Sequence, residues 1–124
     1  MPEPKEHYNI ALEAFNWAEK IYNEEDYHTA SLNYINATIK FNDFLCHKYL
    51  HEIFSRKHHS DITFIKNLEK FLKVDYTSYK TAYEFLMDHK NQADYGIGVS
   101  ENVAKQIQRK ARQIKEITER HYPG

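Results

Sequence analysis

The chain has 124 residues and a mass of 14.9 kDa, which is enough for one compact domain and too little for two ordinary ones. Hydrophobic residues make up 41% and charged residues 28%, a balance typical of a globular chain and unlike that of a disordered one. The net charge of −1 gives the whole chain no general attraction for nucleic acid or anionic membranes. Three glycines and three prolines are too few turn-formers for a sandwich or barrel of many short strands.

The single cysteine, Cys46, excludes an internal disulfide and a cysteine-based zinc finger, and it fits a reducing compartment. No run of eighteen apolar residues is present that could span a membrane. Residues 1–6 lack the basic-then-apolar order of a secretory signal. We therefore expect a soluble, cytoplasmic protein in which residues 1–124 form a single domain.

The apolar residues recur at spacings of three and four, which predicts helices along the whole chain. A first helix is expected to begin at Pro2 or Pro4 and to end at the acidic residues 24–26, which also suit the start of the next helix. Its inward stripe would consist of Tyr8, Ala11, Phe15, Ala18 and Tyr22, with Ile10, Ala14, Trp17 and Ile21 beside it. A band of this width predicts contact with two neighbouring helices.

The second helix is predicted to be the longest, from residue 27 to about Arg56, and to measure roughly 45 Å at 1.5 Å per residue. Two apolar lines follow it, one of Tyr27, Ala30, Tyr34, Ala37, Phe41 and Phe44, the other of Ile35, Ile39, Cys46, Leu50, Ile53 and Phe54. Two such lines predict that this helix is the central spine of the fold.

Three further helices are predicted. Ser60 can cap a helix over residues 61–74, and a fourth helix covers about 78–94. Gly96 and Gly98 form the only flexible break, where a left-handed C-cap fits, and Ser100 can cap a last helix that ends at Tyr122. The core candidates are Ile62, Ile65, Leu68, Phe71, Leu72, Tyr79, Tyr83, Phe85, Leu86, Met87, Val103, Ile107, Ala111, Ile114 and Ile117. The sequence thus predicts an all-α fold, an up-and-down bundle of four to five antiparallel helices with a long second helix.

Charge is distributed unevenly along the chain. Residues 1–27 carry seven acids and two lysines. The last helix carries six cations against three acids, and the cations are Lys105, Arg109, Lys110, Arg112, Lys115 and Arg120. If the first and last helices are neighbours, this difference is structural complementarity. The alternative is that the last helix presents a surface to phosphate or RNA.

Histidines and carboxylates suggest one candidate metal site. Asp43, His47 and His51 follow one another at spacings of four, so a continuous helix would place them on one face. His58, His59 and Asp61 lie just beyond and could add ligands. The other interpretation is a solvated or interface face without metal, because the Glu-x-x-His motif of a di-metal bundle is missing.

Other reactive or aromatic residues have a structural interpretation as well. Cys46 is expected to be buried and inert, because its neighbour His47 points about 100° away on a helix. The tyrosines at 27, 34, 49, 79, 83 and 95 could stack on bases, although aromatic residues at helical spacing more often belong to a core.

Several short patterns follow one another along nearly the whole chain. Asn9-x-x-Leu12 and Ala18-Glu19 in the first helix lead to Tyr27-His28-x-Ala30 at the start of the second. A histidine-containing turn at 58–60, a short helix ending near Phe71, Ala93-Asp94-Tyr95 and Ser100-x-x-x-Ala104-x-x-Ile107-x-x-x-Ala111 complete the order. In this order and spacing the chain resembles the small prokaryotic HEPN-domain proteins (higher eukaryotes and prokaryotes nucleotide-binding).

The resemblance implies a five-helix bundle, commonly a homodimer, that is often paired with a minimal nucleotidyltransferase in toxin–antitoxin systems. Catalytic members of the family are metal-independent ribonucleases with an Arg-x4–6-His motif across the dimer. None of the four arginines here is followed by a histidine at that distance. The nearest equivalent is 90–95, with Lys90 in the arginine position and Tyr95 in the histidine position. Tyrosine, with a pKa near 10, is a poor base at neutral pH.

We therefore expect a non-catalytic module without a cofactor, binding a nucleotide, RNA or another nucleic-acid phosphate, or a nucleotidyltransferase partner. The candidate ligand contacts are Lys90, Asn91, Tyr95, Arg56, His58 and His59. Two alternatives remain open: a ribonuclease with a degenerate site, and a metal-dependent hydrolase that uses His47 and His51. A homodimer is expected, with Tyr49 and Phe54 as a plausible contact patch.

Overall fold

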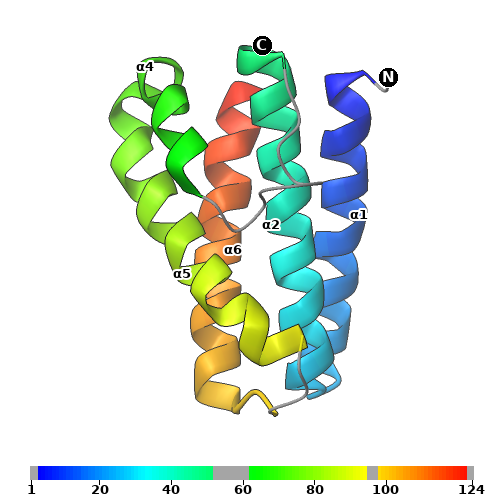
Figure 1. Ribbon diagram of the computed structural model, residues 1–124. Helices are drawn as coiled ribbons and strands as arrows, with labels where there is room; N and C mark the ends of the chain where they lie inside the picture. Colours follow the sequence, from blue (N-terminus) through cyan, green and yellow to red (C-terminus); the bar gives the residue numbers. More distant parts are fainter. Residues whose placement is uncertain (1–2, 52–61, 95–97, 123–124) are drawn as a thin grey trace.

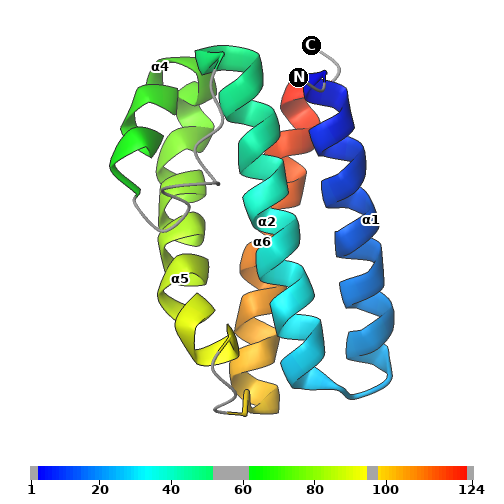
Figure 2. The same ribbon diagram turned by 45° about the vertical axis from the view of Figure 1, so that its right-hand side comes forward.

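Four long helices run alternately up and down in the described part of the chain (Figures 1 and 2). They are α1 (Pro4–Asn23), α2 (Tyr27–Leu50), α5 (Tyr76–Asp94) and α6 (Glu101–His121). The computed structural model describes residues 3–51, 62–94 and 98–122, except for the side chains of 62–64 and 91–94. No strand occurs in these residues, so the predicted all-α, up-and-down bundle is confirmed. None of the described helices is both long and apolar enough to cross a membrane.

A tight acidic turn joins α1 to α2. Glu25 adopts a left-handed backbone conformation with φ of 66°, and Asp26 is the N-cap of α2. The Asp26 carboxylate accepts a hydrogen bond of 3.2 Å from the backbone N–H of Thr29, which satisfies one of the free donors at the start of the helix. The acidic residues therefore form the turn and the beginning of the second helix, as predicted.

The central element is α2, which contacts α1, α5 and α6. Small residues allow α1 and α2 to pack closely, because Ala11 and Ala18 on α1 and Ala30 and Ala37 on α2 are completely buried. Phe15 on α1 meets the ring of Tyr34 on α2 edge to face, with centroids 5.5 Å apart. The predicted spine is thus confirmed. The turquoise ribbon of α2 lies between α1 and α5 in both views (Figures 1 and 2).

The second helix is shorter than predicted. It ends at Leu50 rather than near Arg56, and its 24 residues correspond to roughly 36 Å. His51 takes φ of 58° and its backbone N–H bonds to the carbonyl of Cys46, which closes the helix with a left-handed cap. Apolar spacing continued past this point in the sequence, but the backbone at His51 does not continue the helix.

The segment between α2 and α5 also differs from the prediction of one regular helix over 61–74. The chain forms a 3₁₀ helix η1 (Ile62–Leu68), a single turn α4 (Glu69–Leu72) and a second 3₁₀ turn η2 (Lys73–Asp75). Apolar residues here recur every three positions, which matches the 3.0-residue turn of a 3₁₀ helix. Lys73, with φ of 54°, then breaks the path before α5.

The last two helices largely follow the prediction. Ser100 is the N-cap of α6 and its hydroxyl accepts a 3.2 Å hydrogen bond from the N–H of Val103. Ile107, Ala111, Ile114 and Ile117 form a buried line on α6, and Val103 is half-buried. Of the two glycines before it, Gly96 lies outside the described residues and Gly98 does not have the predicted left-handed conformation.

Hydrogen bonds satisfy polar groups inside the core. The Tyr79 hydroxyl on α5 donates to the Asn42 carbonyl oxygen on α2 at 2.6 Å, and both residues are buried. The Gln108 amide on α6 donates to the Tyr34 hydroxyl at 2.9 Å. Because a buried polar group without a partner is costly, these two bonds fix how α5 and α6 sit against α2.

One part of the predicted core lies at the surface. Ile10 and Trp17 on α1 are 51% and 49% exposed, whereas Tyr8, Ala11, Phe15 and Ala18 are buried as predicted. The width of the apolar band on α1 predicted contact with two neighbouring helices. In the structure α1 packs mainly on one of them, α2. The described structure therefore leaves this second line of α1 partly uncovered.

Replacing Tyr79 by phenylalanine tests the link between α5 and α2. The variant removes the donor to the buried Asn42 oxygen, and we expect the free energy of unfolding to fall by about 1–3 kcal/mol in urea denaturation. The control is Tyr76→Phe on the same helix, whose hydroxyl has no hydrogen bond to the described residues and which should change stability by less than about 0.5 kcal/mol. Equal losses in both variants would contradict this role for the Tyr79 hydroxyl.

Candidate functional site

Most residues of the predicted ligand site lie outside the described part of the chain. Arg56, His58, His59 and Tyr95 belong to the segments that the structure does not describe, as does the side chain of Asn91. Lys90 is half-buried on the last turns of α5 and interacts with other parts of the protein. The contact set predicted from the sequence therefore stays a prediction, with Lys90 as its one described side chain.

The structure does not bring Asp43, His47 and His51 together on one helix face. Asp43 is 1% exposed and His47 is half-buried, whereas His51 is an exposed C-cap residue beyond the end of α2. Among the described residues no three His, Cys, Asp or Glu side chains are placed so that they could hold a metal ion. The further ligands that the metal alternative could use, His58, His59 and Asp61, lie outside the described residues, so this alternative stays a prediction.

A pair of histidines that the sequence analysis missed is buried between α1 and α2. The rings of His7 and His47 lie edge to face with centroids 5.4 Å apart, and His7 is only 7% exposed. The Nε2 atom of His7 and the Nδ1 atom of His47 are buried and have no hydrogen-bond partner. The spacing of four between His7 and Ala11, within the inward stripe, was the signal that could have identified it.

The electrostatic surroundings keep His7 neutral. Burial lowers its pKa most strongly, and the attraction of the nearby Asp43 carboxylate opposes that effect. Positive charge on His47 or Lys40 lowers the pKa further. The Nζ atom of Lys40 lies 3.7 Å from Oδ2 of Asp43, so the two side chains form an ion pair. A neutral imidazole can accept a proton, and the groups that face His7 are Asp43, His47, Lys40 and Glu6.

A second polar cluster holds the end of α6 against α2. The Tyr49 hydroxyl is 2.8 Å from Nδ1 of His121, and Lys48 donates to the backbone carbonyl of His121. On the far side of the imidazole, Nε2 of His121 lies 3.9 Å from Asp75, which also pairs with Arg120 at 2.8 Å. Lys48 thus gives a backbone carbonyl at the C-terminal end of α6 a hydrogen-bond partner. It also places a cation where the helix dipole favours positive charge.

The role of this second cluster is structural: it holds the C-terminal end of α6 against α2. Burial raises the pKa of Tyr49, which makes its phenol a poorer acid, and burial also lowers the pKa of Lys48 and of His121. The ring of Tyr49 is stacked on Phe71 with centroids 4.6 Å apart. One face of the half-buried Tyr49 ring is therefore covered within the chain, and the predicted dimer patch stays a prediction because Phe54 lies outside the described residues.

The cations of α6 fall into two groups. Arg112 makes a two-pronged contact with Glu19 of α1, with its nearer distance 2.8 Å, and Lys115 and Arg120 pair with Glu119 and Asp75. Of these pairs, only Arg112–Glu19 shows the complementarity between the first and last helices, since Glu119 lies on α6 itself and Asp75 on η2. Lys105 and Arg109 are exposed one turn apart, and neither has an ion pair within the described residues. Lys110 lies over the Phe85 ring at 5.9 Å.

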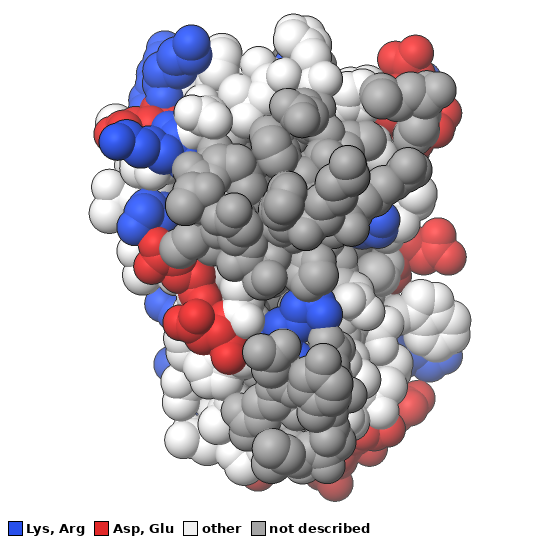
Figure 3. Space-filling model, viewed as in Figure 1, with Lys and Arg blue, Asp and Glu red and all other residues white. Residues whose placement is uncertain are grey.

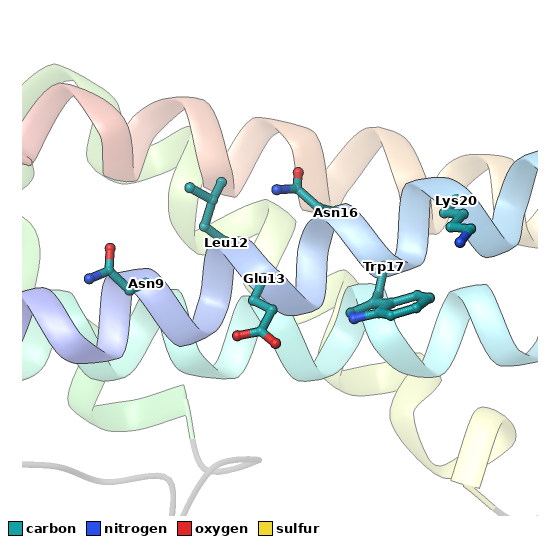
Figure 4. A pocket seen from close by; sticks show the side chains of 6 residues that line it. All are labelled: Asn9, Leu12, Glu13, Asn16, Trp17 and Lys20. Atoms are coloured by element: carbon teal, nitrogen blue, oxygen red, sulfur yellow. The ribbon is translucent and has the colours of Figure 1, made fainter.

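The described surface is hollowed along α1 by an open groove of about 430 Å³. It is lined by Asn9, Leu12, Glu13, Asn16, Trp17 and Lys20, all from α1 (Figure 4). On the face seen in Figure 3, acidic side chains gather along the right-hand side, over α1, and basic ones at the upper left, over α4. A groove formed by one helix does not enclose a ligand as a catalytic cleft would.

Comparison with known protein families, with curated proteins and with solved structures finds no match for this chain. The resemblance to HEPN-domain proteins thus rests on the sequence patterns alone.

The buried histidines predict how stability depends on pH. The pKa values of His7 and His121 are lower in the folded chain than the ordinary value of 6.5, so the unfolded chain binds more protons. The contribution of these two histidines to the free energy of unfolding is fully present above pH 6.5. It decreases as the pH falls through the pKa values of the folded chain. We expect the free energy of unfolding, measured in urea, to fall from pH 6.5 to pH 5.5 by up to about 1.4 kcal/mol per histidine.

Matched variants identify the groups responsible for that slope. His121→Gln should reduce the slope, whereas His51→Asn should leave it unchanged because His51 is exposed and Asn also tolerates its left-handed backbone. A stability that stays level over this pH range, or that rises toward pH 5.5, would contradict the assignment of neutral buried histidines.

Proposed function

We propose that this chain is a non-catalytic, HEPN-type helical module that binds a phosphate-bearing ligand, a nucleotide or a stretch of RNA. The observation that carries the proposal is the pair Lys105 and Arg109, which are exposed one turn apart on α6 without an ion pair in the described residues. Cβ atoms at this spacing are about 5–6 Å apart, so both cations can contact one phosphate group or two adjacent ones.

A second group of side chains, on α5 and α6, supports a nucleotide rather than a simple anion. Phe85 and His89 on α5 are half-buried, their ring centroids lie 4.3 Å apart, and Lys110 of α6 lies over the Phe85 ring. Aromatic and imidazole rings beside cations are typical of surfaces that stack bases while they neutralise phosphates. Lys110 thus has an aromatic edge next to it.

The proposed lack of catalysis rests on the segment that corresponds to the family motif. Metal-independent RNA cleavage needs a base for the 2′-hydroxyl proton and a cation for the phosphate. In the segment that corresponds to the family motif, Lys90 can supply the charge but Tyr95 cannot act as a base near neutral pH. Ligand binding without turnover is the activity that remains.

The resemblance also implies a partner. HEPN modules of this size are often encoded as one half of a toxin–antitoxin pair with a minimal nucleotidyltransferase, and we propose the same class of partner here. A nucleotide-binding module and a nucleotidyltransferase would share a ligand, which gives the association a chemical reason.

Binding of a fluorescent single-stranded RNA, followed by anisotropy, tests the ligand proposal. Charge reversal in the Lys105→Glu, Arg109→Glu double variant should weaken binding at least about tenfold and reduce the salt dependence by about 0.7 per lost phosphate contact. The matched control reverses Lys66 and Lys70, which are also exposed and one turn apart but lie on η1 and α4. Equal losses in both double variants would show that binding follows net charge, contrary to the proposal.

The segment predicted from the sequence is tested in the same assay. Lys90→Ala combined with Tyr95→Phe should lower RNA affinity while the circular dichroism of the helices is retained. The RNA should stay intact with and without EDTA. Cleavage of the RNA by the purified protein would contradict the non-catalytic assignment, and its sensitivity to EDTA would distinguish a metal-dependent enzyme from a ribonuclease.

A further inference from the structure

The second apolar line of α1 has the spacing of a helix-pairing seam. Ile10, Ala14, Trp17 and Ile21 follow one another at intervals of four, three and four residues, as in a heptad pattern. Ile10 is 51% and Trp17 is 49% exposed, while Ala14 and Ile21 are half-buried at the edge of the core. Two of the three large apolar side chains that are exposed in the described residues therefore lie on this one line.

We propose that this line, the α1 seam, is where a second copy of the chain docks, helix against antiparallel helix. In the symmetric arrangement the two-fold axis passes between the levels of Phe15 and Asn16. Ile10 then faces Ile21 of the second copy, and Trp17 faces Ala14 of the second copy. The small side chain of Ala14 leaves room for the largest side chain in the chain, so large and small residues alternate across the contact.

Charge complementarity selects the second copy as the occupant. Glu13 and Lys20 flank the α1 seam on the same side, two turns apart, and neither has an ion pair within the described residues. In the antiparallel arrangement Glu13 of each copy lies only two residues, roughly 3 Å along the axis, from Lys20 of the other. Two symmetric ion pairs therefore form at the rim, which fix the register more than they add affinity.

A parallel arrangement does not give this match. With two helices in register, Trp17 would face Trp17 and Ala14 would face Ala14, which leaves one layer overfilled and another empty. Glu13 would lie level with Glu13, and Lys20 level with Lys20, so the flanking charges would repel each other. The sequence of α1 is thus complementary to itself only when the second helix runs in the opposite direction.

The contact is expected to be weak and reversible. One helix face from each copy makes an interface at the small end of the range for specific complexes, so association should occur in the micromolar range. Trp17 is the anchor, because a large aromatic side chain that becomes buried at the centre of an interface carries much of its binding energy. This inference does not depend on the proposed ligand, since the α1 seam and the exposed cations of α6 lie on different helices.

Sedimentation velocity over a range of protein concentrations tests the proposal. The wild-type chain should pass from monomer to dimer, and the emission of Trp17, the only tryptophan, should shift to shorter wavelength over the same range. Trp17→Ala should weaken dimerisation at least about tenfold. The control is Val74→Ser, which alters another exposed apolar side chain, 94% exposed on η2, and should leave dimerisation unchanged.

A charge swap tests the antiparallel register itself. Glu13→Lys and Lys20→Glu should each weaken the dimer, because each places like charges together, and the double variant Glu13→Lys, Lys20→Glu should recover the wild-type affinity. Both positions changed are exposed, so circular dichroism should show folded protein in every case. The RNA affinity of monomeric Trp17→Ala should be unaffected, which separates this test from that of the proposed function.

Several results would overturn the proposal. They are a wild-type chain that stays monomeric at high micromolar concentration, a dimer that Trp17→Ala does not weaken, and a double swap weaker than both single variants. Association only with a different protein through α1 would equally assign the seam to another occupant.

Discussion

The burial of α2 on several sides at once is the constraint on which the rest of the structure depends. Thirteen of its residues are buried, among them the polar Ser31, Thr38, Asn42 and Asp43. Apolar packing can come from many neighbours, but a buried polar group needs a specific one. Ser31 and Thr38 bond to carbonyls one turn back on their own helix, and Asn42 requires Tyr79. The position of α5 is set by that requirement.

The position of α1 has a different origin. Completely buried alanines on α1 and α2 bring the two helices together. The other contacts of α1 are at its edges, where Glu19 pairs with Arg112 and the ring of Tyr8 stacks on Tyr122 at 4.0 Å. A helix held mainly along one stripe keeps part of its apolar surface available, and this is why Ile10 and Trp17 remain exposed.

The two histidine clusters show how similar residues serve different purposes. His121 has partners on both ring nitrogens or close to them, and its cluster closes the end of a helix. His7 and His47 each keep a buried nitrogen without a partner. Burial lowers the pKa of His7 and of His121 because it removes the hydration of a charged ring, which favours their neutral form. The acid sensitivity that we expect of this fold therefore comes from histidines buried by helix packing.

Much of the fold was predictable because helical periodicity is a local property. The stripes of α1 and α6, the caps at Asp26 and Ser100 and the burial of Cys46 were all evident from residue spacing. The end of α2 and the 3₁₀ turns of residues 62–75 were not, because the apolar pattern around them also fits a regular helix. The candidate ligand contacts remain predictions, since most of them fall outside the described residues.

The amino-acid sequence by itself determined the helical class, the order of the helices and most of their inward faces, because these depend on neighbours three and four residues apart. Only the tertiary structure decided that Trp17 is exposed, that Tyr49 is covered by Phe71 and that His7 meets His47. The two contacts join residues 22 and 40 positions apart in the chain, and a periodic pattern does not specify which helix lies beside which.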